Sequence, residues 1–246
     1  MEKIASGDFI KIEYSGKVGA KNQVFDTTDV KTAKEAGIFD EKKKYGASLV
    51  VVGKEQCIPG LDEALQGMDV GEQKTVEIAP EKAFGARNPE LVRVVPISEF
   101  RKRNIEPFPG MPVQLDNATA MIRSVNSGRV LVDMNHPLAG EKVTYEVKVA
   151  AKLKSVEERI EGILEFHELN GGKVSVKGDS AELAFSANIE KDGNFLIKKA
   201  NSVGFILHFV DGIKKVRVVE EYERKEEKKD EKETKVEKKE PKEAKK

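Results

Sequence analysis

The clearest pattern of apolar and polar positions lies between residues 58 and 68. Apolar side chains recur there at intervals of three, four and three residues, which predicts a short helix with one buried face. The four apolar residues are Ile58, Leu61, Leu65 and Met68. The polar residues that we expect to lie off this face are Asp62, Glu63 and Gln66. Pro59 suits the first turn and Gly67 the end, and so short a helix needs a sheet to cover.

Strands are predicted on both sides of this helix, where apolar and polar residues alternate or β-branched residues cluster. The expected strands cover 8–14, 23–28, 48–52, 74–78 and 144–149. Strand periodicity around one helix predicts an α+β domain with an antiparallel sheet. The strands at 74–78 and 144–149 are too far apart in the chain for an ordinary connection, so we expect a second folded unit between them.

This inserted unit is expected to be mainly β. Its pattern predicts strands at 91–95, 112–115, 120–125 and 129–134 and a short helix at 98–103. Methionine is flexible and polarisable, so an exposed surface rich in it would adapt to many apolar partners. The candidate surface residues are Val94, Phe108, Met111, Met121 and Met134. The alternative is that so small a unit needs these side chains for its own core.

The end of the chain predicts a further unit and a tail. The pattern indicates helices at 156–168 and 196–210 and strands at 173–176, 181–185 and 213–222, in the order α-β-β-α-β. Such a unit would mediate dimerisation or bind other proteins, and its residues favour neither. Residues 223–246 are almost entirely Lys and Glu and cannot bury a core, so we expect a disordered tail.

Composition narrows the class of protein. The 246 residues are 39% hydrophobic, enough for a sizeable core. The 43 basic and 43 acidic side chains cancel, which argues against a nucleic-acid or membrane-surface partner. No apolar run approaches the ~20 residues of a transmembrane helix and no signal-peptide pattern is present, so a cytoplasmic protein is expected. The single cysteine, Cys57, excludes an internal disulfide framework and is interpreted as a packing residue.

Residues suited to cofactor chemistry do not gather in the sequence. The histidines at positions 136, 167 and 208 stand apart without the spacing of metal ligands, so they are interpreted as packing or surface residues. The sequence contains no glycine-rich phosphate loop, catalytic-triad pattern or basic-aromatic patch. We therefore expect neither a metal nor a cofactor.

Five short motifs occur in an order that resembles one enzyme family. They are Tyr14-Ser15-Gly16, Val24-Phe25-Asp26, Ile58-Pro59-Gly60-Leu61-Asp62-Glu63-Ala64-Leu65, Ala83-Phe84-Gly85, and His136-Pro137-Leu138-Ala139-Gly140 with Tyr145-Glu146-Val147. This order is similar to that of the FKBP-type peptidyl-prolyl cis/trans isomerases. The late position of the last motif resembles the SlyD-type branch, which carries an insert in the flap. The last folded unit is similar in placement to the C-terminal domain of long archaeal FKBPs.

The resemblance implies a domain organisation. An FKBP half-barrel sheet, wrapped on one short helix, would be built from residues 1–87 and 136–154. An insert-in-flap chaperone domain would occupy 88–135, and an α+β C-terminal domain 155–222, followed by the tail at 223–246.

The resemblance also implies an apolar groove between the helix and the sheet. The residues that it assigns to catalysis are Asp26, Tyr145, Tyr14 and Phe84. Those that it assigns to substrate binding are Phe25, Cys57, Ile58, Leu61, Leu138 and Ala139. Amide resonance sets the barrier to X-Pro rotation at ~18–20 kcal/mol. An apolar pocket removes water donors from the imide oxygen and can bind the twisted imide better than either planar form, so no nucleophile is required.

Asp26 has two readings. It follows an apolar strand and precedes two threonines, so from position alone it would cap a turn through its own backbone. The family pattern favours a carboxylate that hydrogen-bonds a tyrosine hydroxyl such as that of Tyr14. Two residues depart from that pattern: Leu61 stands where many members have Trp, and Phe84 where many have Tyr. Leu61 keeps the floor apolar, whereas Phe84 removes one hydrogen bond.

We therefore expect a peptidyl-prolyl cis/trans isomerase with chaperone activity. Its partners would be unfolded or nascent polypeptides with exposed X-Pro bonds and hydrophobic stretches, and the C-terminal domain would be a site for a homodimer. No nucleic-acid or membrane partner is expected. The alternatives are a holdase whose groove binds but hardly turns over, and a dimeric adaptor.

Overall fold

The computed structural model describes residues 3–115, 118–169, 171–186 and 193–221. The predicted tail at 223–246 lies outside these residues. Within the described part of the chain, each helix is too short or too polar to cross a membrane.

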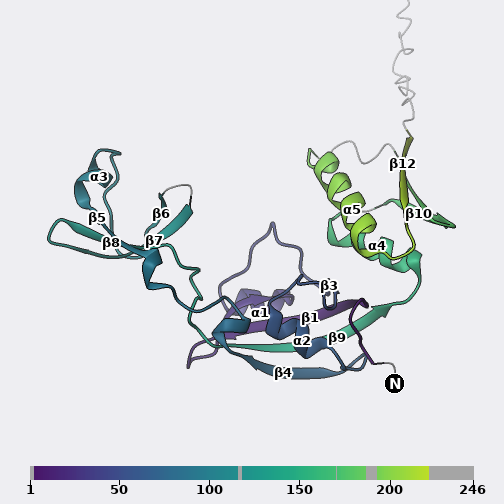
Figure 1. Ribbon diagram of the computed structural model, residues 1–246, viewed down its shortest axis with the longest axis horizontal. Helices are drawn as coiled ribbons and strands as arrows, with labels where there is room; N and C mark the ends of the chain where they lie inside the picture. The colour runs from purple at the N-terminus through teal and green to yellow at the C-terminus, as the bar shows by residue number, and fades with distance from the viewer. Residues whose placement is uncertain (1–2, 116–117, 170, 187–192, 222–246) are drawn as a thin grey trace, which may run out of the picture.

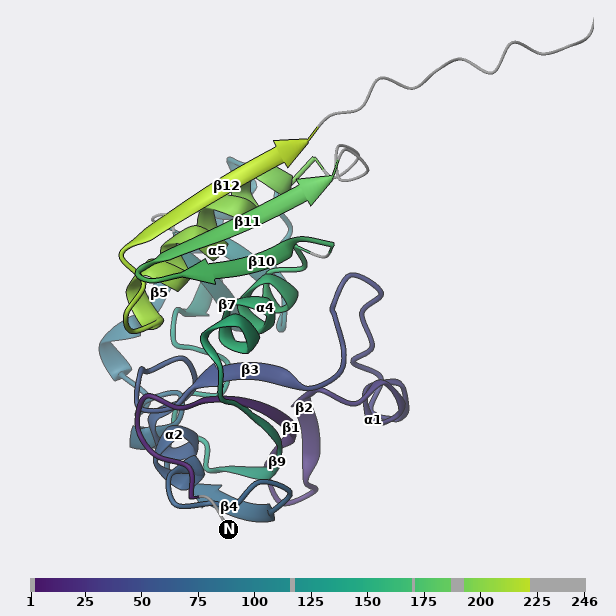
Figure 2. The same cartoon turned by 90° about the vertical axis from the view of Figure 1, so that its right-hand side faces the viewer.

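The first sheet is antiparallel throughout, as predicted. Its central strand, β1 (Phe9–Val18), pairs with β2 (Gln23–Thr27) and β3 (Ser48–Val51) on one side and with β9 (Val143–Leu153) on the other. The outer strand β4 (Gln73–Ile78) pairs with the far side of β9. Figures 1 and 2 show these strands as one curved sheet around α2. Segments more than sixty residues apart in sequence therefore meet in one sheet.

Strand β1 is longer than the alternation of its side chains indicates. We expected it to cover 8–14, but it continues to Val18. The pairing of β1 with β2 shifts register between Gly16 and Lys17, and such a bulge breaks the two-residue period from which the strand end was predicted. The chain then turns through Gly19 and Asn22, which both have positive φ.

The predicted central helix is present as α2 (Pro59–Leu65), and its apolar face is buried against the first sheet. Leu61, Leu65 and Met68 are at most 2% exposed, and Ile58 packs against the same core. Helix and sheet approach closely at Gly60, where an added Cβ would lie 2.4 Å from the Ile78 Cγ2 atom. Glycine at this motif position therefore has a packing cause.

The predicted exposure of Asp62 was wrong. We expected it off the buried face, but only 7% of it is exposed. Its Oδ1 atom accepts a hydrogen bond of 2.7 Å from the backbone N–H of Gly53, in the loop after β3. That loop covers the polar side of the short helix, and a buried carboxylate needs such a donor. The helix is thus enclosed on two sides.

The inserted unit forms a separate four-stranded sheet. Its elements are β5 (Val92–Pro96), α3 (Ile97–Arg101), β6 (Pro112–Leu115), β7 (Ala118–Asn126) and β8 (Arg129–Asp133). The strand order is β5-β8-β7-β6, and the helix and strands correspond to the predicted ones. Between β7 and β8, Ser127 and Gly128 have positive φ, as in a tight hairpin turn. Val113, Ile122, Val130 and Val132 are buried in a core of the unit's own.

The C-terminal unit has the predicted order of elements. They are α4 (Val156–Phe166), β10 (Lys173–Lys177), β11 (Ser180–Ser186), α5 (Phe195–Phe209) and β12 (Lys215–Glu221). Strand β11 is central, antiparallel to β10 and parallel to β12. A capping box at Ser155 and Glu158 fixes the start of α4. The shorter elements that complete the chain are α1 (Val30–Glu35) and two 3₁₀ turns, Pro80–Lys82 and Pro89–Leu91.

The C-terminal unit shares one hydrophobic core with the outer side of the first sheet. Phe9, Leu49 and Val51 of that sheet are buried in the same cluster as Ile160 and Ile163 of α4. Figure 2 shows α4 between β3 and the sheet of β10, β11 and β12. Because this core crosses from one unit to the other, α4 is fixed relative to the first sheet.

Candidate functional site

A groove of about 820 Å³ opens between α2 and the first sheet. Nine of the ten residues assigned to catalysis and substrate binding line it: Tyr14, Phe25, Asp26, Cys57, Ile58, Leu61, Phe84, Leu138 and Tyr145. The tenth, Ala139, is 5% exposed and lies outside the lining. Ala139 is thus a buried neighbour of Leu138 and not part of the groove surface.

Aromatic rings form the walls of the groove. The Phe25 ring meets Phe84 and Tyr145 edge to face, with centroids 5.7 and 5.8 Å apart, and the rings of Tyr14 and Tyr145 lie 5.8 Å apart. Gly16 makes room for this cluster, because a Cβ there would lie 2.8 Å from Phe25 Cζ and 3.1 Å from Tyr145 Cζ. The cluster is therefore apolar, tightly packed and fixed in place.

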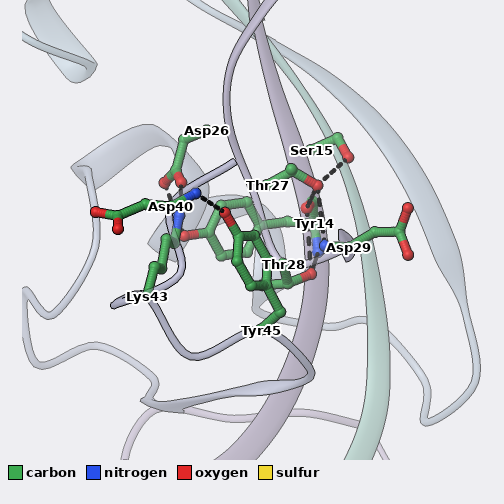
Figure 3. Close-up of polar contacts among 9 residues, drawn as sticks. All are labelled: Tyr14, Ser15, Asp26, Thr27, Thr28, Asp29, Asp40, Lys43 and Tyr45. Carbon is green, nitrogen blue, oxygen red and sulfur yellow. Dashed lines mark hydrogen bonds and ion pairs between the residues drawn. The ribbon is translucent and has the colours of Figure 1, made fainter. Parts of the chain in front are cut away.

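Asp26 lies at the edge of this aromatic cluster. The Tyr14 hydroxyl donates a hydrogen bond of 2.8 Å to Asp26 Oδ2, and the Lys43 ammonium pairs with Oδ1 (Figure 3). The predicted contact with Tyr14 is thus present, and the carboxylate is bonded to side chains rather than capping a turn. Lys43 comes from the loop before β3. Because it is one of several lysines in that stretch, the sequence gave no reason to choose it as the partner of Asp26.

The backbone around Tyr14 and Asp26 is held by a ladder of hydroxyl groups. The Tyr14 N–H donates to Thr28 Oγ1 at 2.9 Å, and the Thr28 N–H donates to the Tyr14 carbonyl at 3.0 Å. One residue further along β1, the hydroxyls of Ser15 and Thr27 lie 2.8 Å apart (Figure 3). The two threonines after Asp26 therefore fasten β2 to β1, which sets the position of Asp26 opposite the Tyr14 ring.

Both tyrosines in the groove keep their protons at neutral pH. Burial, and secondarily the Asp26 carboxylate, raises the pKa of Tyr14 well above its ordinary value. The same two causes raise the pKa of Tyr145. Each hydroxyl is therefore a hydrogen-bond donor over the whole physiological range, one directed to Asp26 and the other lying in the groove wall.

Cys57 and Ile58 form the wall at the start of α2. Burial, and secondarily the Asp62 carboxylate, raises the pKa of the Cys57 thiol to about 12, which agrees with its interpretation as a packing residue. The Ile58 carbonyl accepts hydrogen bonds from the N–H groups of Leu61 and Asp62. Both lone pairs of this oxygen are used, so the Ile58 N–H is the backbone group that this residue has to offer a bound chain.

Sequence reasoning missed several groove residues. His136, expected as a packing or surface residue, is exposed and stacks on Phe84 with centroids 4.5 Å apart and an interplanar angle of 3°, and it also lines the groove, a role that the sequence analysis did not assign to it. The side chain of Gln56 accepts the Val51 N–H through Oε1, while its buried Nε2 has no partner within the described chain. His136 stands in one of the five recognised motifs, and this position was the signal in the sequence that could have placed it at the groove. Phe166 and Phe205 of the C-terminal unit also line the groove.

The candidate surface residues of the inserted unit fall into two groups. Val94 and Phe108 are each 59% exposed. Met111 and Met134 pack against the unit's core, and Met121 is half-buried. The structure thus favours core packing for Met111 and Met134 and leaves Val94 and Phe108 as the open apolar side chains of this set.

Ion pairs and hydrogen bonds join the two chain segments that lead into the inserted unit. Asp133 is 1% exposed and pairs with the guanidinium groups of Arg87 and Arg123. Asn88 and Asn135 are joined by two hydrogen bonds, of 2.8 and 2.9 Å, across the same junction. Burial acts to raise the pKa of Asp133, but hydrogen bonds from Asn135 and the two arginines outweigh it and hold that pKa below its ordinary value.

Among the residues described, no three His, Cys, Asp or Glu side chains gather closely enough to hold a metal ion. His167 lies at the end of α4, with Nδ1 3.2 Å from the Ser202 hydroxyl, and burial lowers its pKa. His208 lies on α5 against Phe209. The groove lining itself offers apolar surface, tyrosine hydroxyls and one carboxylate.

Comparison with known proteins finds two matching family models. One, described as the FKBP-type peptidyl-prolyl cis-trans isomerase family, matches residues 1–100, and the other, described as the IF domain of FKBP26, matches residues 93–138. The chain is 37% identical over 146 residues to the short-type peptidyl-prolyl cis-trans isomerase of Methanocaldococcus jannaschii, covering 59% of this chain and 92% of that protein.

Two bacterial peptidyl-prolyl isomerases also match this chain. The FKBP-type isomerase SlyD of Helicobacter pylori is 32% identical over 150 residues, covering 54% of this chain and 80% of that protein. The FKBP-type 16 kDa isomerase of Escherichia coli is 32% identical over 107 residues, covering 42% of this chain and 71% of the relative.

Proposed function

This chain belongs to the FKBP-type peptidyl-prolyl cis-trans isomerases, and we propose that it rotates X-Pro bonds in unfolded polypeptides that its inserted unit helps to capture. The observation that carries the assignment of the reaction to this groove is the Tyr14–Asp26 hydrogen bond at the edge of the aromatic cluster. At this place in the groove, fixed polar groups lie beside an apolar enclosure.

The groove lowers the barrier by changing the surroundings of the imide. Amide resonance places negative charge on the carbonyl oxygen, and water donors stabilise that planar form. Enclosure by Phe25, Phe84 and Leu61 replaces water with apolar surface, which weakens the resonance form. Rotation then requires only that the groove bind the twisted imide better than the planar ones, and each ~1.4 kcal/mol of such preference gives tenfold in rate.

The polar groups of the groove hold the twisted imide. The protonated Tyr145 hydroxyl and the Ile58 N–H are donors suited to carbonyl groups of the bound chain. The Asp26 carboxylate lies where it can interact favourably with the partial positive charge on the twisted nitrogen, and Tyr14 fixes its orientation. No covalent intermediate is needed, because only a torsion angle changes.

Client capture is assigned to the exposed apolar side chains of the inserted unit. Val94 and Phe108 supply apolar surface that the unit's own core does not use. The double variant Val94→Ser and Phe108→Ser should weaken suppression of client aggregation more than it weakens turnover of a short peptide. Equal suppression by the variant and the native protein would exclude this surface.

The catalytic assignment is tested by exchange of a short X-Pro peptide, measured by magnetisation-transfer NMR. Asp26→Ala should lower catalysed exchange at least tenfold, equal to ~1.4 kcal/mol in the transition state. Asp40→Ala is the matched control, since Asp40 is an exposed carboxylate of the neighbouring loop outside the groove lining. Full activity of a folded Asp26→Ala variant would remove Asp26 from the reaction.

A replacement of residues 88–135 by a short loop separates the two activities. The inserted unit has its own core, so the first sheet and α2 should still fold. We expect near-full exchange of the short peptide and loss of aggregation suppression.

A native protein that suppresses aggregation without catalysing exchange would instead be a holdase, and a concentration-dependent mass with neither activity would indicate a dimeric adaptor. Homodimerisation and a cytoplasmic location stay predictions.

A further inference from the structure

The isomerase groove has a wall that comes from outside the matched family models. Those models end at residue 138, whereas Phe166, at the end of α4, and Phe205, on α5, line the same groove as Tyr14 and Tyr145. The ring centroids of Phe166 and Phe205 lie 6.2 Å apart, and Phe209 packs against Phe205 at 4.5 Å. We name Phe166 and Phe205 the aromatic wall.

The aromatic wall is held in place relative to the catalytic residues. Helix α4 reaches β9 so closely at Gly162 that a Cβ there would lie 2.6 Å from Leu153 Cδ1. Beside the wall, Glu165 pairs with Lys11 of β1 at 2.6 Å, and the Lys44 ammonium donates to the Glu165 carbonyl at 2.9 Å. The wall is therefore part of the same rigid body as β1, which also carries Tyr14.

Core packing does not account for Phe166. It is 45% exposed, although the neighbouring residues Ile163 and Leu164 are at most 3% exposed in the shared core. An open phenyl ring that lines an enzyme's groove is placed to contact what the groove binds.

The size of the groove leaves room for such a contact. Its volume of about 820 Å³ lies toward the upper end of the ~300–1,000 Å³ common for ligand sites, so it accommodates more chain than one X-Pro pair. A polypeptide continues on both sides of its proline, and Tyr14, Ser48, Leu49 and Phe166 all line the same groove.

We propose that the aromatic wall is a second subsite of the enzyme, which receives an apolar side chain of the client, aromatic for preference, a few residues from the proline. This inference rests on the proposed function, because it assumes that the substrate chain lies in the groove. The C-terminal unit thereby selects substrates at the active site itself.

The test uses the full chain and a set of equal-length peptides. Each peptide has one X-Pro bond in an otherwise Ala- and Ser-based sequence, with a single Phe placed at successive positions before or after the proline. For the best position, the native protein should show kcat/KM about tenfold above the peptide without Phe. In Phe166→Ala this ratio should fall to near one, and in Phe166→Leu most of it should remain, because leucine is also apolar.

Leu207→Ala is the matched control, because Leu207 is 46% exposed on α5 but lies outside the groove lining. It should keep the native ratio, and unfolding curves of all variants check that each is folded. A ratio in Phe166→Ala equal to the native one, or a native protein with no preference at any position, would overturn the subsite.

Two further outcomes are distinguishable. A native protein that turns over none of the peptides would refute the proposed function itself. A native protein that shows no preference at any position and has a doubled mass, which returns to the mass of one chain in Phe166→Ala, would mean that a second copy of the chain covers the aromatic wall, and would overturn the assignment to the client.

Discussion

Replacing Gly16 with alanine should damage catalysis more than stability. The backbone of Gly16 lies outside the positive-φ region, so alanine can adopt it, but its Cβ would lie 2.8 Å from Phe25 Cζ and 3.1 Å from Tyr145 Cζ. Overpacking of this kind costs ~1–3 kcal/mol. The reduced freedom of the unfolded chain returns ~0.4–1 kcal/mol, so the net loss in free energy of unfolding should be ~1–2 kcal/mol.

The catalytic loss should be larger, because both displaced rings line the groove. A misplacement of ~1 Å in an active site can cost ~100-fold, and we expect kcat/KM for a short X-Pro peptide to fall ~10–100-fold. Exchange is measured by magnetisation-transfer NMR at a temperature where urea unfolding shows the variant to be folded.

Gly172→Ala is the control for packing strain alone. Its Cβ would lie 2.5 Å from Phe185 Cε1, a comparable clash with a phenyl ring, but within the C-terminal unit and outside the groove lining. It should lose similar stability and keep its kcat/KM. Equal catalytic losses in the two variants, or full activity of Gly16→Ala, would refute the reasoning that Gly16 positions the aromatic cluster.

Three smaller predictions follow. Lys43→Met should lower kcat/KM less than fivefold, since its ion pair with Asp26 is partly exposed and worth at most ~1 kcal/mol, and a tenfold loss in high salt would contradict this. Cys57, with a pKa raised to about 12, should be alkylated by iodoacetamide at pH 8 ~100–1000-fold more slowly than a free cysteine, and rapid labelling of the folded protein would exclude that pKa. Asp133→Asn should destabilise the inserted unit by ~1–3 kcal/mol in amide hydrogen exchange. Because the folded pKa of Asp133 is lowered, its stabilisation is complete above the ordinary value of ~3.9 and is lost as pH falls through the folded pKa, so a native unit insensitive to acid in that range would contradict it.

The helix of the site could be predicted because its position follows from a local pattern, whereas the groove residues were expected from the family resemblance. The spacing of Leu61, Leu65 and Met68 predicted the helix and its buried face, and both are present. The Tyr14–Asp26 hydrogen bond was expected from the family resemblance, whereas position alone favoured a turn cap; it forms because the two residues stand on adjacent strands joined by a short turn. Asp62 was placed wrongly because helical periodicity reports one buried face and carries no information about a loop that covers another.

The aromatic wall could not be predicted in this way, but one residue of the sequence indicates its cause. Glycine in a helix interior costs ~1 kcal/mol relative to alanine, so Gly162 in the middle of α4 needs a compensating reason. That reason is the contact with Leu153, which brings α4 onto the first sheet and places Phe166 at the groove. Gly162→Leu should therefore push α4 away and remove the preference for Phe-containing peptides without altering Phe166 itself. A variant that keeps this preference while α4 is displaced would show that the placement of Phe166 does not depend on Gly162.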